Sequence, residues 1–446
     1  MMATWTKRST TPHCEQEIDE RRRGNTLRRV GVGGAAAVLT LALTACGGSA
    51  GAGEGGGEGV ALGATKDEYA AALADMDPVE LRLQSAVPEG QGTSVGFAAY
   101  AEALNEWSGG KISVKPYYSA SIAKPGDDVD AFNDGRLDLG IVVSGASPER
   151  FPLTPVWVDA DQGGISDARL DWLSMQLSTL ERGFASEEFM QEYENEGIQV
   201  ILPYLGSDDT GLLCREPFSA ADDLRGRTVR IGSPSQRAQT DKLGMTPVSL
   251  PFTELYEGLQ RNVVDCVFTP LGFAKASGLI PLASNWIGAA QNTGGVVGSP
   301  FGVSKQVWDG LPLAARQLLH DRLDVYVGET LRTSTLEAAE AFAMLRENGG
   351  GIQENLDSSV TDALKDAANS KLDAVRRSAD IDGEALITAA EESRAKWLDL
   401  LGGAGYEKIA WGDDLVEWVR ANPDLEFNDA MDLFVEEVLN ANRPEK

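Results

Sequence analysis

Histidine and basic residues are scarce in this chain of 446 residues. His13 and His320 are the only two histidines, so His-based triads, His-rich metal sites and most general-base chemistry have few residues to draw on. The 39 Lys and Arg residues stand against 68 Asp and Glu, which gives a formal net charge of -29. This balance argues against a nucleic-acid partner, because phosphate binding requires a basic surface. We therefore expect no catalytic residue, no metal site and no cofactor.

A run of apolar residues long enough for a comfortable membrane span is also missing. The segment from Val30 to Ala42 is too short for a permanent transmembrane helix. The hydrophobic fraction of 42% fits a globular protein, and the length suggests two or three folding units. Catalysis by carboxylates alone, as in glycosidases, stays an alternative, but the sequence distinguishes no pair of acids for it.

The amino-terminal region has the organisation of an export signal. The apolar run follows a group of arginines and ends in Leu43-Thr44-Ala45-Cys46-Gly47, which resembles a bacterial lipobox. In such signals, cleavage leaves the cysteine, here Cys46, as a lipid-bearing N-terminus. We expect residues 1–45 to be a lipoprotein signal peptide and residues 46–65, which are rich in glycine, to be a flexible tether. The protein would then be extracytoplasmic and lipid-anchored to the outer face of the bacterial cell membrane. An ordinary signal peptide is the alternative, and both Sec and twin-arginine export stay open.

Cysteine is equally rare. Cys14 falls within the predicted signal peptide and Cys46 is the predicted lipidation site, which leaves Cys214 and Cys266 in the body. Outside the cytoplasm such a pair can be oxidised to a disulfide. Two separate buried thiols are the alternative, and the sequence leaves both open.

The body alternates between strand and helix patterns. Alternating apolar segments between residues 79 and 143 flank the stretch Val95 to Trp107, which has one apolar helical face. A second series runs from about residue 208 to residue 268. Beyond residue 300 the pattern is mostly helical, and the first long helix is expected from Ala314 to Glu347. Because repeated β-α-β units indicate a largely parallel sheet covered by helices, the sequence predicts two α/β lobes with a cleft between them.

Several short motifs follow one another in a characteristic order. They are ADDLRGRTVRI at 221–231, LGMTPV at 243–248 and PFTELYEGLQ at 251–260, with VPEG at 87–90 and FNDGRLD at 132–138 upstream. In this order and spacing they resemble the substrate-binding proteins of TRAP transporters, the DctP-like periplasmic solute receptors. The similarity covers roughly residues 79 to 385.

The resemblance implies a two-lobed periplasmic-binding-protein-like α/β fold with a ligand cleft between the lobes and long C-terminal helices. Lobe I would comprise residues 79–207 plus about 295–334, and lobe II residues 208–294. Residues 335–446 would be a helical region bracing both lobes, with an extension beyond about residue 402. A small organic acid would bind in the cleft, the lobes would close on it, and TRAP-type membrane permease subunits would receive it.

Arg230 is the candidate anchor for the ligand. The resemblance implies that this arginine holds the ligand's carboxylate, and a guanidinium fork can pair with both carboxylate oxygens. From strand context alone, an exposed strand arginine or an internal salt bridge is the alternative.

Four further candidate ligand contacts follow from the resemblance. Phe252 would pack against the carbon skeleton of the ligand, while Ser233 and Thr269 would supply polar contacts. Thr210 occupies the place where some dicarboxylate and sialic-acid receptors have a second arginine, and the nearby Arg215 is expected to be displaced. The sequence therefore favours a monocarboxylate over a dicarboxylate or a sialic acid.

A different use of the same fold is the main alternative. A sensor or scaffold lipoprotein could keep the receptor architecture without delivering a solute, and the extension beyond about residue 402 fits that alternative as well.

Overall fold

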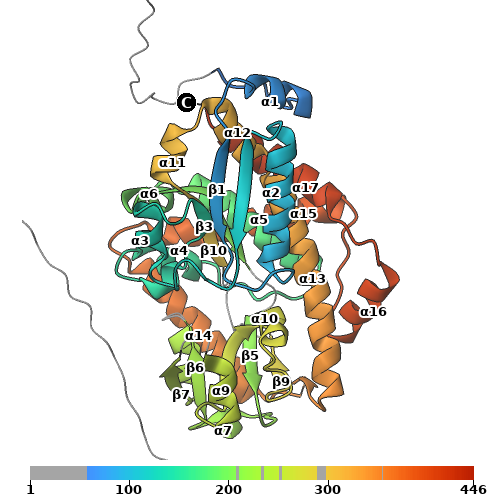
Figure 1. Ribbon diagram of the computed structural model, residues 1–446. Coiled ribbons are helices and arrows are strands. Elements are labelled where there is room, and N and C mark those ends of the chain that lie inside the picture. The colour runs from blue at the N-terminus through green and yellow to red at the C-terminus, as the bar shows by residue number, and fades with distance from the viewer. Residues whose placement is uncertain are drawn as a thin grey trace, which may run out of the picture. The chain divides into compact units, whose positions relative to one another are not determined.

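The computed structural model describes residues 58–206, 210–232, 236–250, 254–288, 298–353 and 355–445. These residues form two β-sheets, A and B, with helices packed on them (Figure 1). The predicted signal peptide, Cys46 and most of the predicted tether lie outside the described residues. Within the described residues, no helix is long and apolar enough to cross a membrane.

Sheet A has the strand order β2-β1-β3-β10-β4. Its first three strands are mutually parallel, whereas β10 runs antiparallel to both β3 and β4. The strand bounds are β1 Val79–Gln84, β2 Ile112–Tyr117, β3 Leu139–Ile141, β4 Ile198–Gly206 and β10 Gly298–Ser304. Leu81 and Leu83 of β1 are buried in an apolar cluster, hereafter cluster 1, together with residues of the surrounding helices. We call sheet A and the helices packed on it the sheet A half.

The helix Thr93–Trp107 of the sheet A half buries Phe97, Tyr100 and Leu104, as the spacing of its apolar residues predicts. Ser186 caps the start of α6 by accepting a hydrogen bond from the Phe189 N–H. The helix bounds are α1 Lys66–Ala72, α2 Thr93–Trp107, α3 Asp128–Asn133, α4 Leu153–Asp159, α5 Leu170–Ala185, α6 Glu187–Asn195, α11 Lys305–Gly310 and α12 Leu313–Asp321.

Sheet B has the strand order β11-β9-β5-β8-β6-β7. The bounds are β5 Thr210–Cys214, β6 Thr228–Ile231, β7 Thr246–Ser249, β8 Cys266–Pro270, β9 Asn285–Ile287 and β11 Gly351–Ile352. Successive residues of β5 point to opposite faces: Leu213 joins one apolar cluster, hereafter cluster 2, and Leu212 joins another. Apolar residues therefore cover both faces of sheet B. Its own short helices are α7 Ala221–Leu224, α8 Gln236–Lys242, α9 Leu255–Gln260 and α10 Leu271–Ala276, and we call this assembly the sheet B half.

Long helices follow, and α13 contacts both halves. Leu323 and Leu331, in its first part, belong to cluster 1, whereas Phe342 and Leu345, near its end, belong to cluster 2. The bounds in this region are α13 Leu323–Glu347, α14 Ser358–Arg376, α15 Gly383–Gly403, α16 Asp413–Ala421, α17 Asn428–Phe434 and the π-helical turn η4 Val435–Leu439.

Candidate functional site

Arg230 lies on β6, an inner strand of sheet B, between β8 and β7. The start of this strand is fixed by Asp265, whose carboxylate accepts hydrogen bonds of 2.8 Å from both the backbone N–H and the hydroxyl of Thr228. Val229 packs into the apolar core, and Arg230 itself is only 5% exposed. The alternative of an exposed strand arginine is therefore wrong.

Two backbone carbonyls orient the Arg230 guanidinium. Its Nε donates to the Leu250 carbonyl at 3.1 Å, and its Nη1 donates to the Phe268 carbonyl at 3.4 Å. The guanidinium also lies close over Gly232, where a Cβ atom would be 2.6 Å from Nη1. Burial lowers the pKa of Arg230 to about 10, so the side chain still carries its positive charge at neutral pH.

Thr269 lies on β8, the strand paired with β6, and Thr210 lies on β5, the strand beyond β8. Thr269 on β8 is opposite Gly211 of β5, and Thr210 is opposite Pro270. Both threonines are buried, and the Thr269 hydroxyl donates to the Pro270 carbonyl at 3.2 Å. Since β6 and β8 are parallel and Arg230 pairs with Val267, all three side chains belong to the end of the sheet where β6 and β8 finish.

The connection from β4 of sheet A to β5 of sheet B enters sheet B at this end. Only residues 207–209 separate Gly206, the last residue of β4, from Thr210, the first of β5. Four residue steps span at most about 14 Å, so the site lies beside the crossing between the halves. Ser233, which follows β6 in the sequence, and Phe252, which follows β7, lie outside the described residues.

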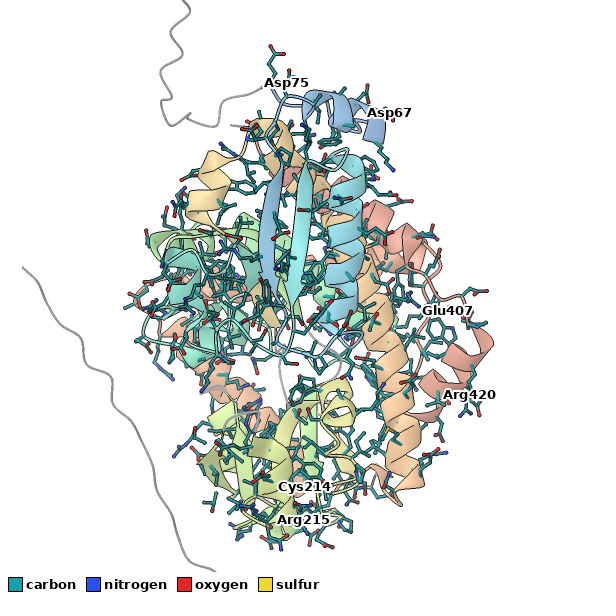
Figure 2. All side chains as sticks on the ribbon, viewed as in Figure 1. Asp67, Asp75, Cys214, Arg215, Glu407 and Arg420 are labelled. Carbon is teal, nitrogen blue, oxygen red and sulfur yellow. A yellow bond between two sulfur atoms is a disulfide. The ribbon has the colours of Figure 1, made fainter. Side chains whose placement is uncertain are left out.

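Arg215 is at the opposite end of the same strand. It follows Cys214, the last residue of β5, and its guanidinium donates to the Leu259 carbonyl. Figure 2 labels Cys214 and Arg215 together at the lower end of the sheet B half. Five residues of extended chain separate Arg215 from Thr210, about 17 Å, so Arg215 does not replace a second site arginine.

The two cysteines of the body form a disulfide. Cys214 on β5 is opposite Cys266 on β8, with Cα atoms 4.1 Å apart. The question that the sequence left open is therefore answered in favour of the bridge. It ties together the two strands that carry Thr210 and Thr269.

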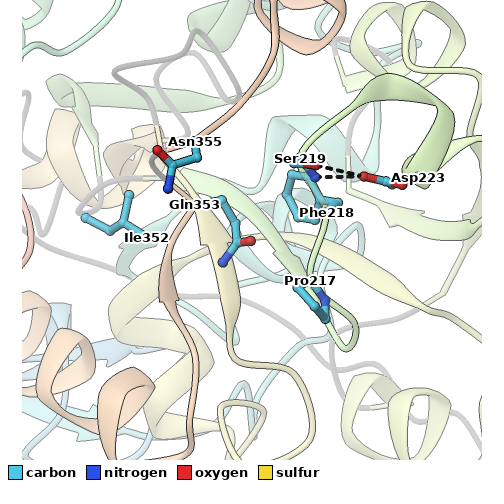
Figure 3. Close-up of a pocket in the computed structure, with 7 residues that line it drawn as sticks. All are labelled: Pro217, Phe218, Ser219, Asp223, Ile352, Gln353 and Asn355. Carbon is cyan, nitrogen blue, oxygen red and sulfur yellow. Dashed lines mark hydrogen bonds between the residues drawn. The ribbon is translucent and has the colours of Figure 1, made fainter.

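Two cavities lie away from this edge. One, of about 440 Å³, is lined by residues that follow β5 and β11, among them Phe218, Ser219 and Gln353; in it the Asp223 carboxylate accepts hydrogen bonds from Ser219 (Figure 3). The other, of about 670 Å³, lies between α13 and the segment from Pro423 to Asp432. Among the described residues there is no group of three or more His, Cys, Asp or Glu that could hold a metal ion.

Gly232 and the Leu250 carbonyl are contacts of Arg230 that sequence reasoning missed. For Gly232, the available signal was a glycine directly after the strand Thr228–Ile231. The Leu250 carbonyl belongs to the backbone and has no side-chain signal, so this contact could be found only from the register of β6 and β7.

Two sheets linked by crossing segments and long helices, with a buried arginine at the crossing edge, define a two-lobed α/β binding protein. Comparison with known proteins identifies the family: the sequence model of the bacterial extracellular solute-binding protein, family 7 (DctP), matches residues 84–378. The chain belongs to this family. It is a solute-binding receptor of the TRAP type, and the family consists of transport receptors rather than enzymes.

Relatives and solved structures agree with this assignment. The C4-dicarboxylate-binding periplasmic protein DctP of Rhodobacter capsulatus is 23% identical over 316 residues, which are 70% of this chain and 86% of the relative. A TRAP solute-binding protein specific for pyroglutamate, from an unidentified marine microbe, superposes with a TM-score of 0.61 at 16% identity, covering 71% of this chain and all of its own. The ectoine-binding protein of the Halomonas elongata TRAP transporter gives 0.60 at 16% identity, covering 71% of this chain and all of its own. These structures establish the shared two-lobed fold.

Proposed function

We propose that this protein captures a small organic monocarboxylate at the Arg230 edge of sheet B and delivers it to TRAP-type membrane permease subunits. In this proposal Cys46 carries a lipid that holds the receptor at the outer face of the cell membrane. The sheet A half and the sheet B half correspond to the expected lobes I and II, and they close on the ligand.

The observation that carries the proposal is the placement of Arg230. A buried guanidinium attracts a carboxylate more strongly than an exposed one, because little water screens the pair. The Leu250 and Phe268 carbonyls hold the guanidinium in place, and we expect the ligand's carboxylate to pair with it.

The preference for one carboxylate comes from Thr210. A second ligand carboxylate would need a second cation, and Thr210 has only a hydroxyl to offer. Arg215, which follows the last residue of β5, donates to the Leu259 carbonyl at the far end of that strand. Solved relatives that bind pyroglutamate, or 3-hydroxybenzoate in a receptor specific for aromatic acids, support ligands of this class.

Thermal unfolding tests the proposal directly. The chain beginning at Gly47 keeps every residue that the structure describes, and it would be screened with mono-, di- and ketocarboxylates and acidic sugars. A ligand at a hundredfold excess over its dissociation constant adds about 2.7 kcal/mol of stability, which for a chain of this size raises Tm by about 3 °C.

Arg230→Ala is the decisive variant and Arg237→Ala its matched control. Arg237 is exposed on α8 of the same half and pairs only with Asp241 among the ion pairs of the described residues. We expect a monocarboxylate hit that persists in Arg237→Ala and disappears in Arg230→Ala. A hit that survives in both variants would place the anchor elsewhere, and no hit across the panel would favour the sensor or scaffold alternative.

A further inference from the structure

One face of sheet B carries Arg230 together with residues of cluster 2. Successive side chains of a strand alternate between its faces, and Val229 belongs to the apolar cluster on the other face, so Arg230 points to the face of cluster 2. Its register partner on β8, Val267, is a member of cluster 2. So are the next partners across the sheet, Leu213 on β5 and Trp286 on β9. We call these four paired residues the first row, and Figure 1 labels β6, β5 and β9 in this order across the sheet B half.

A second row lies on the same face, two residues nearer to the edge beside the crossing. It consists of Gly232, which directly follows β6, Thr269 on β8, and Gly211, which is opposite Thr269 on β5. Because the two glycines have no side chain, only the threonine projects from the second row. The surface is therefore lower at this edge than along the first row.

The large side chains at the two ends of the first row lean over these glycines. A Cβ atom on Gly232 would lie 2.6 Å from Arg230 Nη1. A Cβ atom on Gly211 would lie 2.5 Å from Cζ2 and 2.8 Å from Cη2 of the Trp286 ring. The Cβ positions of opposite residues on antiparallel strands are about 5 Å apart, so the indole edge lies about that far from Thr269. The threonine thus stands between a guanidinium on one side and an indole on the other.

The indole N–H of Trp286 has no hydrogen-bond partner among the described residues, although the side chain is fully buried. In tryptophan, Cε2 joins Nε1 to Cζ2, so the N–H belongs to the part of the ring that reaches Gly211. A buried donor without an acceptor destabilises the protein, and such groups are rare in folded proteins. An acceptor on a bound ligand would satisfy this donor.

We propose that Trp286 forms the wall of the ligand site opposite Arg230, and that it selects a monocarboxylate whose flat ring carries a hydrogen-bond acceptor. This inference rests on the proposed function, in which the ligand's carboxylate pairs with the guanidinium. The ring of the ligand lies over the second row against the indole, and its acceptor receives the indole N–H. Contact between two aromatic rings favours binding by about two- to tenfold beyond the effect of the buried area.

The test compares acids that share one carboxylate and differ in the ring. Benzoate and cyclohexanecarboxylate have the same number of carbon atoms, but only benzoate is flat, and 3-hydroxybenzoate adds an acceptor to the flat ring. Titration calorimetry with the chain beginning at Gly47 measures their affinities. We expect benzoate to bind about threefold more tightly than cyclohexanecarboxylate. The affinity for 3-hydroxybenzoate should exceed that for benzoate by about threefold, because the indole N–H gains its acceptor.

Two variants separate the ring of Trp286 from its N–H. Trp286→Phe keeps a ring and removes the donor, so the advantage of 3-hydroxybenzoate over benzoate should disappear. Trp286→Leu removes the ring as well, so benzoate should lose its advantage over cyclohexanecarboxylate. Trp157→Phe is the matched control, because Trp157 is buried on α4 of the sheet A half and its indole N–H also lacks a partner among the described residues. A variant that only loosened the fold would weaken all three acids alike and leave their ratios unchanged.

The outcomes distinguish this inference from the proposed function. Unchanged affinity ratios in both Trp286 variants, with binding still lost in Arg230→Ala, would overturn the role of Trp286 and leave the carboxylate receptor standing. A parent protein that binds cyclohexanecarboxylate as tightly as benzoate overturns it even where neither Trp286 variant folds. If none of the three acids binds but the thermal screen finds another monocarboxylate, the inference alone fails. If the screen finds none either, the proposed function fails with it.

Discussion

The Arg230 guanidinium is buried, so its positive charge lowers the stability of the ligand-free protein. The same charge can attract an anionic ligand. The carbonyls of Leu250 and Phe268 accept hydrogen bonds from it and orient it. In the proposed function, a ligand carboxylate would bring a full opposite charge into a site that water screens weakly. Burial of Arg230 would then strengthen the proposed attraction between the guanidinium and the ligand.

Gly232 supports this arrangement by having no side chain. A Cβ at this position would lie 2.6 Å from Arg230 Nη1 and 3.1 Å from Cζ, so Gly232→Ala must displace the guanidinium. We expect ligand affinity to fall about tenfold, equivalent to about 1.4 kcal/mol, by isothermal titration calorimetry. Gly310→Ala is the control, because no atom lies within 4 Å of its added Cβ. Equal affinities in both variants would contradict the assigned position of the guanidinium.

The pH dependence of binding follows from the pKa of Arg230, which burial lowers to about 10. Only the charged form attracts a carboxylate, so affinity should be constant from pH 7 to 9 and fall as the pH rises through 10. At pH 10.5 about a quarter of the ligand-free sites stay charged, which predicts affinity about fourfold weaker than at pH 8. Burying the charge opposes folding below pH 10, so this unfavourable contribution to stability declines above it. Titration calorimetry at each pH, with Tm of the ligand-free protein as a control, would measure the effect; undiminished affinity at pH 10.5 would exclude Arg230 as the anchor.

At the scale of elements, the disulfide between β5 and β8 covalently links the strands that carry Thr210 and Thr269. The bridge joins cysteines 52 residues apart, and a loop of that length is expected to contribute about 4 kcal/mol by restricting the unfolded chain. We expect Cys214→Ala/Cys266→Ala to shift the urea midpoint downward by the corresponding amount. Reductant should lower the midpoint of the parent protein toward that of the double variant and leave the double variant unchanged. A parent midpoint that does not respond to reductant during unfolding would show that the cysteines are not bridged.

The elements that could be predicted from sequence are those with strong local patterns. The helix expected at Val95 to Trp107 is α2, Thr93–Trp107, and its end at Ser108 follows from the glycines after it. By contrast, the continuous helix expected from Ala314 to Glu347 is two helices, α12 and α13, separated at Arg322. Strand β10 was missed because Gly298–Ser304 contains two glycines and a proline, and its partners are 160 and about 100 residues away in sequence.

The candidate site likewise combines features that local sequence predicts with features that depend on contacts distant in sequence. Arg230 could be selected from sequence because it stands in a motif of the family. Its closeness to Thr269 and Thr210 depends on the order β5-β8-β6, and that order depends on contacts distant in sequence. The Cys214–Cys266 pairing likewise follows from strand register, which neither cysteine's local sequence encodes.

At the scale of the molecule, the two ends of the described body are tied together. Val60, which follows the glycine-rich segment, donates its N–H to Gln317, and the Gln317 amide donates to the Pro444 carbonyl. Arg443 donates to the Val60 carbonyl at 2.8 Å and to the Asp321 carboxylate at 3.0 Å. If Cys46 is anchored in the membrane, any pull on the tether enters the body at Val60 and reaches the sheet A half through these contacts.

Arg443 is the centre of this tie, because it also donates to the Tyr69 hydroxyl of α1 at 2.9 Å. Hydrogen bonds to a charged group contribute about 1.5–3 kcal/mol each, so Arg443→Ala should speed amide exchange over residues 60–73 by about ten- to a hundredfold. Arg420→Ala is the matched control: Arg420 belongs to the same C-terminal region, is exposed on α16 and is labelled in Figure 2 away from α1. Exchange over β5 to β8 should be the same in both variants, since Arg443 contacts only the sheet A half. If residues 60–73 exchange equally in the two variants, the apolar contacts of Tyr69 and Leu73 hold the N-terminal segment, and Arg443 does not secure the point where the tether leaves the body.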